Sequence, residues 1–150
     1  MDTGSSSAHY YDETASPLLV ACIWRVHTAN RLSSSMVELR DAETYDVVAS
    51  LGVFPGLLMC AAFSPDNLRL AVGGCNAELM LFDVANLRNG ASKLCQTRST
   101  TVTSMCFNKS GTKLLTTCGK LTLWDVSSPE QLSVIVTFPL PEPDTEQNVY

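Results

Sequence analysis

A six-residue segment that recurs at a fixed interval constrains the fold of this chain more than any other feature. The copies are Val37–Ala42 (VELRDA), Leu79–Val84 (LMLFDV) and Leu121–Val126 (LTLWDV), and each begins 42 residues after the one before it. Each copy has apolar residues at its first and third positions, as a β-strand with a buried face does, and a bulky residue followed by Asp at its fourth and fifth. A period of roughly 20 to 50 residues is typical of proteins built from repeated units. The sequence therefore predicts three copies of one structural unit.

Short strands separated by tight turns fill the rest of each unit. The first unit is expected to have strands at Leu18–Trp24, Met36–Arg40 and Tyr45–Leu51, with a polar loop over Arg25–Ser35 and a break over Gly52–Gly56. The other two units are expected to have strands at Leu58–Phe63, Arg69–Gly73, Glu78–Phe82 and Lys93–Thr97, and at Val102–Phe107, Lys113–Thr117, Leu121–Asp125 and Val134–Phe138. Such spacing indicates an all-β fold, and the fixed repeat favours a β-propeller. We expect a partial propeller with two full four-stranded antiparallel blades and one partial blade.

The two ends of the chain differ from its body in composition. Residues 1–16 are rich in Ser, Thr, Ala and Asp without a periodic pattern, so a disordered acidic segment is expected there. Three prolines follow residue 138, and proline cannot donate to a strand ladder, so residues 139–150 are expected to be a Pro-rich acidic tail or linker. The repeat region is assigned to residues 17–138.

Charge and cysteine usage limit the classes of function. The net charge is −5, but the two tails hold six acidic residues and none of the ten Lys and Arg, so the repeat region is nearly neutral. This region lacks the basic stripe that nucleic-acid binding requires. The six Cys include no C-x-x-C pair, the longest apolar runs are seven residues, and the first residues do not resemble a signal peptide. We expect free thiols and a cytoplasmic or nuclear protein without a transmembrane segment.

The repeats resemble those of the WD40 (WD-repeat) β-propeller family. Val102–Val126 carries the best match, Leu58–Val84 the second, and the first unit keeps mainly Val37–Ala42, so the resemblance covers residues 17–138. The resemblance implies structural roles for residues of the repeated strands, namely Asp41, Phe82, Asp83, Thr116, Trp124 and Asp125. The Gly-His dipeptide that often precedes a WD40 blade is absent here. Only Thr116 and Trp124 fit the hydrogen-bond tetrad of the family, so apolar packing must supply most of the blade stability.

The number of repeats is too small for a closed ring. Propellers have about 4–8 blades, and this chain supplies two full blades and one partial one. Three explanations stay open: the chain is a fragment of a longer propeller, it completes a ring with other chains, or it is a small β-fold that borrows the motif.

No catalytic, metal-binding or cofactor-binding constellation stands out in the sequence. The Ser33–Ser35 run has no adjacent base, and His9 and His27 have no Cys or carboxylate at ligand spacing. We therefore expect a non-enzymatic scaffold that binds other proteins in a multiprotein complex, with self- or hetero-association to complete the propeller. The candidate binding residues lie in expected loops and are Arg25, His27, Arg31, Asn76, Arg98 and Lys120. The alternative is a phosphoinositide-binding propeller, although the chain lacks the Arg-Arg pair that such propellers use.

Overall fold

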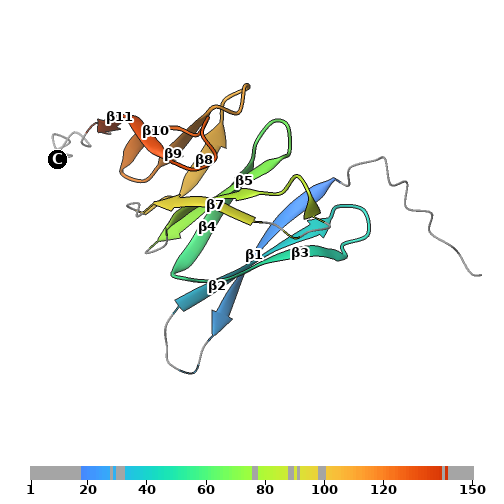
Figure 1. Cartoon of the computed structure of the whole chain (residues 1–150). Coiled ribbons are helices and arrows are strands. Elements are labelled where there is room, and N and C mark those ends of the chain that lie inside the picture. Colours follow the sequence, from blue (N-terminus) through green and yellow to red (C-terminus); the bar gives the residue numbers. More distant parts are fainter. Residues whose placement is uncertain are drawn as a thin grey trace, which may run out of the picture.

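The chain folds into three antiparallel β-sheets arranged in series (Figure 1). A computed structural model describes residues 18–27, 29, 33–75, 78–87, 90, 92–97, 101–139 and 141. Sheet 1 contains β1 (Leu19–His27), β2 (Ser33–Asp41) and β3 (Val47–Pro55). Sheet 2 contains β4 (Leu57–Phe63), β5 (Arg69–Cys75), β6 (Leu79–Asp83) and β7 (Ser92–Thr97). Sheet 3 contains β8 (Ser104–Phe107), β9 (Lys113–Thr117), β10 (Lys120–Asp125) and β11 (Ser133–Pro139).

This architecture confirms the predicted fold class. Two sheets have four strands and one has three, and in every sheet the strands are hydrogen-bonded in chain order. The repeated segment forms β2, β6 and β10, which occupy the strand position before the last in each sheet. The proposed tails at residues 1–16 and 139–150 fall mostly outside the described residues, so those two assignments stay predictions.

The two faces of the repeated strand pack against different neighbours. Val37 and Leu39 of β2 are fully buried in a hydrophobic cluster, here called core 1, which also contains Met80 and Phe82 of β6. The alternate residues of β6, Leu79 and Leu81, point to the other face of the strand. They lie with Trp124 of β10 in a second hydrophobic cluster, here called core 2. Core 1 therefore joins sheets 1 and 2, and core 2 joins sheets 2 and 3. The period-two alternation of a strand is what allows one sheet to serve both cores.

Sheet 2 is the middle layer of this arrangement. Its central strands carry Leu70 and Val72 in core 1 and Ala71 in core 2, all with no exposed surface. Core 1 also contains an edge-on aromatic pair, in which the rings of Phe54 and Phe82 lie 5.7 Å apart at 65°. Burial of large apolar side chains on both faces gives sheet 2 most of its stabilising contacts.

The connection between β3 and β4 differs from the expectation. A break over Gly52–Gly56 was expected, but β3 continues to Pro55 and only Gly56, at φ 90°, separates it from β4. The chain passes through Gly52 at φ 110°, a conformation that residues with a Cβ rarely adopt. β3 is bulged against β2 near this point, and the bulge absorbs the extra residue.

Ser35 holds this corner in place, and its position corrects the expected polar loop over Arg25–Ser35. β1 continues to His27 and β2 starts at Ser33, so both ends of the expected loop are strand. Ser35 has no exposed surface, and its Oγ donates to the Gly56 carbonyl at 3.0 Å and accepts from the Leu58 amide at 3.0 Å. A Ser-rich run usually marks a solvated loop, whereas here one hydroxyl satisfies two backbone groups inside the protein.

The Asp of each repeat caps the turn that follows the repeated strand. Asp41 Oδ1 accepts from the Glu43 amide at 2.7 Å, and Asp83 Oδ1 accepts from the Ala85 amide at 2.8 Å. Asp125 Oδ1 accepts from the Ser127 amide at 2.9 Å and from the Ser127 hydroxyl. The bond from residue i to the amide of residue i+2 defines an Asx turn. The recurrence of Asp at one place in the repeat therefore has a local backbone cause.

Candidate functional site

The strand ends gather at two opposite rims. Because the strands alternate in direction, β1, β3, β5, β7 and β9 end at one rim, here called rim 1. The strands β2, β4, β6, β8 and β10 end at the other, here called rim 2. Loops on a rigid sheet scaffold are the usual place for binding residues, so each rim is a candidate surface.

The structure places all described candidate binding residues at rim 1. Arg25 is exposed and lies on β1 rather than in a loop, and His27 is the last residue of that strand. Lys120 is exposed and is the first residue of β10. Arg31, Asn76 and Arg98 lie outside the described residues. The candidates thus share a rim but come from different sheets, and the assignment of a binding role to them stays a prediction.

Hydrogen bonds between neighbouring segments hold rim 1 together. The Val102 amide donates to the Gly74 carbonyl at 3.0 Å, which ties the segment before β8 to sheet 2. The Thr103 amide and hydroxyl both donate to the Thr117 carbonyl, at 2.8 and 2.9 Å. The thiol of Cys60 lies 3.7 Å from the Val102 carbonyl. The described backbone of sheets 2 and 3 at rim 1 is therefore connected into one platform.

Close backbone packing also fixes this platform. A Cβ at Gly74 would lie 2.0 Å from the Leu57 carbonyl oxygen and 2.6 Å from the Leu58 Cα. Real Cβ atoms do not approach backbone so closely, so only glycine fits between β4 and β5 at this point.

Arg69 joins sheets 2 and 3 at rim 2, and sequence analysis did not single it out. Its guanidinium donates to the Val126 carbonyl at 2.5 Å and to the Gly111 carbonyl, and it lies 5.9 Å from the ring centroid of Phe107. The sequence contains a signal for this role, which the pairing of the strands makes visible. Arg69 pairs with Asp83, and Lys113 pairs with Asp125 in the same way. A cation therefore stands opposite the repeated Asp in both complete sheets.

The two tetrad residues meet inside sheet 3. The Trp124 indole Nε1 donates to the Thr116 hydroxyl at 2.9 Å, and the two residues are 7% and 3% exposed. The pair satisfies two polar groups that would otherwise be buried without partners. Phe82, at the equivalent position of β6, is 2% exposed in core 1.

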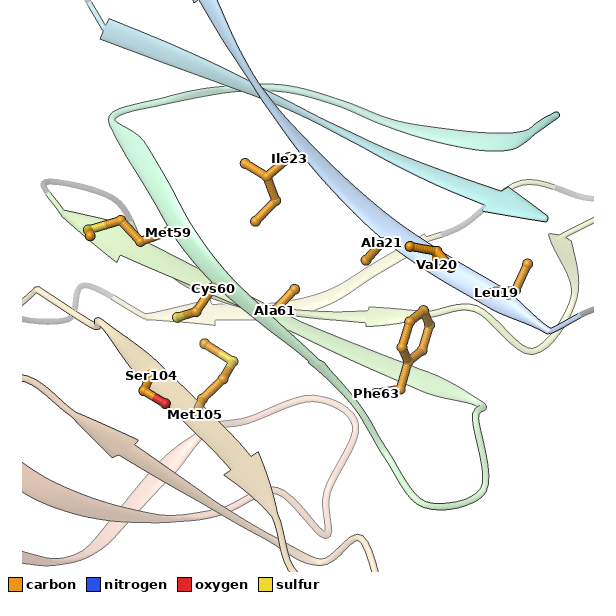
Figure 2. Close-up of a pocket in the computed structure, with 10 residues that line it drawn as sticks. All are labelled: Leu19, Val20, Ala21, Ile23, Met59, Cys60, Ala61, Phe63, Ser104 and Met105. Atoms are coloured by element: carbon orange, nitrogen blue, oxygen red, sulfur yellow. The ribbon is translucent and has the colours of Figure 1, made fainter. Parts of the chain in front are cut away.

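A groove of about 590 Å³ runs along the inner strands of the three sheets (Figure 2). Figure 2 shows β4 between β1 on one side and β8 on the other. The lining residues are Leu19, Val20, Ala21, Ile23, Met59, Cys60, Ala61, Phe63, Ser104 and Met105. Burial raises the pKa of the Cys60 thiol above its usual value, so this thiol is protonated and a poor nucleophile at neutral pH. Most of the side chains that line the groove are apolar.

The part of the chain that the structure describes contains neither a metal-binding cluster nor a membrane-spanning helix. There, no three His, Cys, Asp or Glu side chains come close enough together to hold a metal ion. Within the same residues, no helix has the length and apolar character needed to cross a bilayer.

Comparison with known proteins finds a relative in sequence and solved structures of similar fold. No protein-family model matches the chain. Over 88 residues it is 31% identical to apoptotic protease-activating factor 1 of Homo sapiens, a WD40-containing protein; this covers 55% of the chain and 7% of that relative. The structure resembles that of a putative 6-phosphogluconolactonase from Bacteroides fragilis with a TM-score of 0.59 at 12% identity. That likeness covers 73% of this chain and 34% of the other.

These likenesses support WD40-like repeats on a β-propeller-like fold. The chain spans only 7% of the curated relative and about a third of the solved chain. The comparison therefore concerns the repeats and their packing, and the activities of the whole relatives do not follow from it.

The expectation of a non-enzymatic protein is contradicted. It rested on the lack of a catalytic constellation in the sequence, yet a solved structure of similar fold is that of a putative 6-phosphogluconolactonase. The fold itself is thus compatible with catalysis and gives no ground to exclude it. At 12% identity the likeness extends to the fold alone and assigns no role to any residue of this chain.

Proposed function

We propose that this chain is a WD40-like repeat module that binds other proteins through rim 1, as part of a larger propeller. The observation that carries the proposal is that strands from all three sheets end at that rim, where hydrogen bonds connect the described backbone of sheets 2 and 3. Backbone that is already fixed needs little ordering when a partner binds, so less of the binding energy is lost as entropy.

Charge on the rim and the sequence relative also support the proposal. Arg25 and Lys120 are exposed at rim 1 and come from sheets 1 and 3. Exposed cations at a rim steer partners and set orientation more than they add affinity. The 88-residue similarity to apoptotic protease-activating factor 1 is consistent with a repeat-type interaction module.

Single charge reversals on opposite rims test the proposal. Arg25→Glu and Lys120→Glu alter rim 1, and Lys109→Glu alters the exposed turn after β8 at rim 2 and is the matched control. Proteins captured by cross-linking in cells would be quantified for each variant after thermal melts have shown equal stability. We expect both rim 1 variants to lose a shared set of partners that the control retains. Equal capture by all three variants would exclude rim 1 as the binding surface.

A membrane surface is the competing ligand for an exposed cationic rim. The same variants would be tested for flotation with vesicles that contain phosphoinositides. Flotation that is lost in both rim 1 variants, together with unchanged protein capture, would favour the lipid over a protein partner.

A further inference from the structure

The two ends of the sheet series present apolar faces that nothing in the described chain covers. The large hydrophobic residues that remain exposed are Leu18, Val20, Trp24, Tyr45, Val47, Val53, Met59, Leu68, Val134, Ile135 and Phe138. All except Met59 and Leu68 belong to or adjoin sheet 1 or sheet 3. Figure 1 shows these two sheets on either side of sheet 2. Exposed apolar surface concentrated at two places marks contact surfaces rather than random exposure.

The 42-residue repeat defines what the exposed face of sheet 3 should contact. Val37 and Leu39 of β2 face sheet 2, and Leu79 and Leu81 of β6 face sheet 3; all four have no exposed surface. Leu121 and Leu123 of β10 stand at the same repeat positions but lie in neither core and are partly exposed.

Neighbouring strands extend this surface of sheet 3, which we call the front face. Leu121 pairs with Phe138 and Leu123 pairs with Val136 on β11, while Leu123 pairs with Leu115 on β9. Phe138 is 51% exposed. Cross-strand partners point to the same side of a sheet, so these side chains make the front face continuous.

The outer surface of sheet 1, which we call the back face, is the complementary surface. Val20, Trp24 and Val53 on this sheet are 41%, 47% and 56% exposed. Arg40 stands where Phe82 and Trp124 stand in the later repeats, and its guanidinium lies 5.8 Å from the Trp24 ring centroid. Glu38 forms an ion pair with Arg40 at 2.9 Å and accepts from the Trp24 indole at 3.2 Å.

The charges of the back face are therefore compensated within sheet 1. A paired carboxylate and guanidinium with a further hydrogen bond can be covered by another surface at lower cost than an isolated charge. The core between sheets 2 and 3 already contains a comparable feature, since Arg69 lies against Phe107 there.

We propose that two copies of this chain associate head to tail into a closed ring of six sheets, with the front face of each copy packed on the back face of the other. The described residues of each copy form three sheets, so two copies fall within the usual range of about 4–8 propeller blades. A two-fold axis then relates two identical contacts, and together these contacts cover all four outer faces. A second copy is favoured as the occupant because one additional chain supplies both missing surfaces.

The contact between copies would continue the pattern of the contact between sheets 2 and 3. Arg69 of sheet 2 donates to the Val126 carbonyl of sheet 3. Lys113 occupies the position of Arg69 in sheet 3, because each pairs with the Asp of its repeat. Ala42 is the residue that precedes Val126 by two repeats. Lys113 of one copy would therefore lie near the Ala42 carbonyl of the other.

The oligomeric state of the unmodified chain is the first test. Sedimentation equilibrium over a wide concentration range should show a species of twice the 16.2 kDa chain mass that does not grow further. A monomer at every concentration would overturn the proposal, and so would a series of larger species, because these indicate an open filament.

Variants on each face separate a head-to-tail contact from a symmetric one. Leu121→Arg with Leu123→Arg alters the front face, Trp24→Arg alters the back face, and Leu68→Arg is the control, since Leu68 is 47% exposed in a rim 2 turn. We expect both face variants to be monomeric and the control to remain a dimer. A mixture of the two face variants should form a weaker dimer, because one of the two contacts keeps both of its unaltered faces.

Other results would contradict this geometry. If only one face variant became monomeric, the contact would be front to front or back to back. If neither did, the faces would not be the interface. Circular dichroism of each variant checks that the sheets are intact, and Phe138→Asp replaces the Leu121 and Leu123 variant if that one does not fold.

Discussion

The hydrogen bond between Trp124 and Thr116 gives the sharpest test of the packing inside sheet 3. Both residues are almost fully buried, and the indole Nε1 lies 2.9 Å from the threonine hydroxyl. Trp124→Phe leaves the Thr116 hydroxyl without this partner, and Thr116→Val leaves the indole N–H without one. A buried polar group without a partner costs about 1–3 kcal/mol. Trp124→Ala also removes most of the side chain from core 2 and should cost about 3–5 kcal/mol.

The double variant Trp124→Phe with Thr116→Val distinguishes the hydrogen bond from simple packing. When both polar partners are replaced by apolar groups, no buried group is left unpaired, so the double variant should cost about 1–2 kcal/mol less than the sum of the single variants. The urea midpoints of the parent, the two single variants and the double variant are measured with far-UV circular dichroism, because this signal comes mainly from the backbone and not from tryptophan. With a slope of about 2 kcal/mol per M, each single variant should lower the midpoint by about 0.5–1.5 M.

Additive costs would refute this reasoning. Variants at independent sites add to within about 0.5 kcal/mol. If the double variant matches the sum within that margin, the two groups are not coupled and the hydrogen bond does not contribute to stability. A midpoint for Trp124→Ala equal to that of the parent would show that core 2 does not depend on this side chain.

Three further changes should each affect stability in a defined direction. Gly74→Ala places a Cβ against the Leu57 backbone and should cost about 3 kcal/mol. Gly73→Ala meets the flexible end of Met105 at 3.1 Å and the Val102 Cβ at 3.3 Å, and should cost about 1 kcal/mol; equal urea midpoints for the two variants would contradict this. Arg69→Met removes charge-assisted bonds to two carbonyls and should cost about 2 kcal/mol or more, and a thermal melt like that of the parent would exclude a bridging role. Hydrogen bonds from the Ser64 and Ser127 hydroxyls, together with backbone amides, lower the pKa of Asp66 and Asp125 below 3.8. The two carboxylates therefore stabilise the fold above pH 3.8, and this contribution is lost as the pH falls through their lowered pKa values. When the urea midpoint is measured against pH in acid, the curve should be flatter for the Asp66→Asn, Asp125→Asn double variant than for the parent.

The order of strands was predictable because it depends on local patterns. The third unit shows this best, since β9 has the predicted bounds Lys113–Thr117 and β10 starts one residue before the predicted Leu121. Alternation and turn residues act over a few positions, so they are visible in one sequence. The Asp of each repeat is a local feature of the same kind, because its hydrogen bond closes the adjacent turn.

Burial was less predictable because it depends on which sheet lies opposite. The seven consecutive apolar residues Leu18–Trp24 are typical of a buried strand, yet Leu18 and Trp24 are 70% and 47% exposed. Ser35 shows the opposite difference, since it was expected in a polar loop but is fully buried at the corner between β3 and β4. Neither degree of burial can be predicted from the local sequence pattern. Each follows from the presence or absence of a neighbouring layer.

The same reasoning explains why sheet 2 holds most of the buried hydrophobic residues in the described part of the chain. In a repeat architecture each unit gains stability mainly from contact with its neighbours, and only sheet 2 has a neighbour on both faces among the described sheets. Leu79 and Leu81 are fully buried, while Leu121 and Leu123 at the equivalent positions of sheet 3 are partly exposed. The front face thus carries apolar residues at the positions that make a sheet contact in sheet 2, and the described residues leave this face uncovered. Any sheet that covers it adds to stability by the same burial that already stabilises sheet 2.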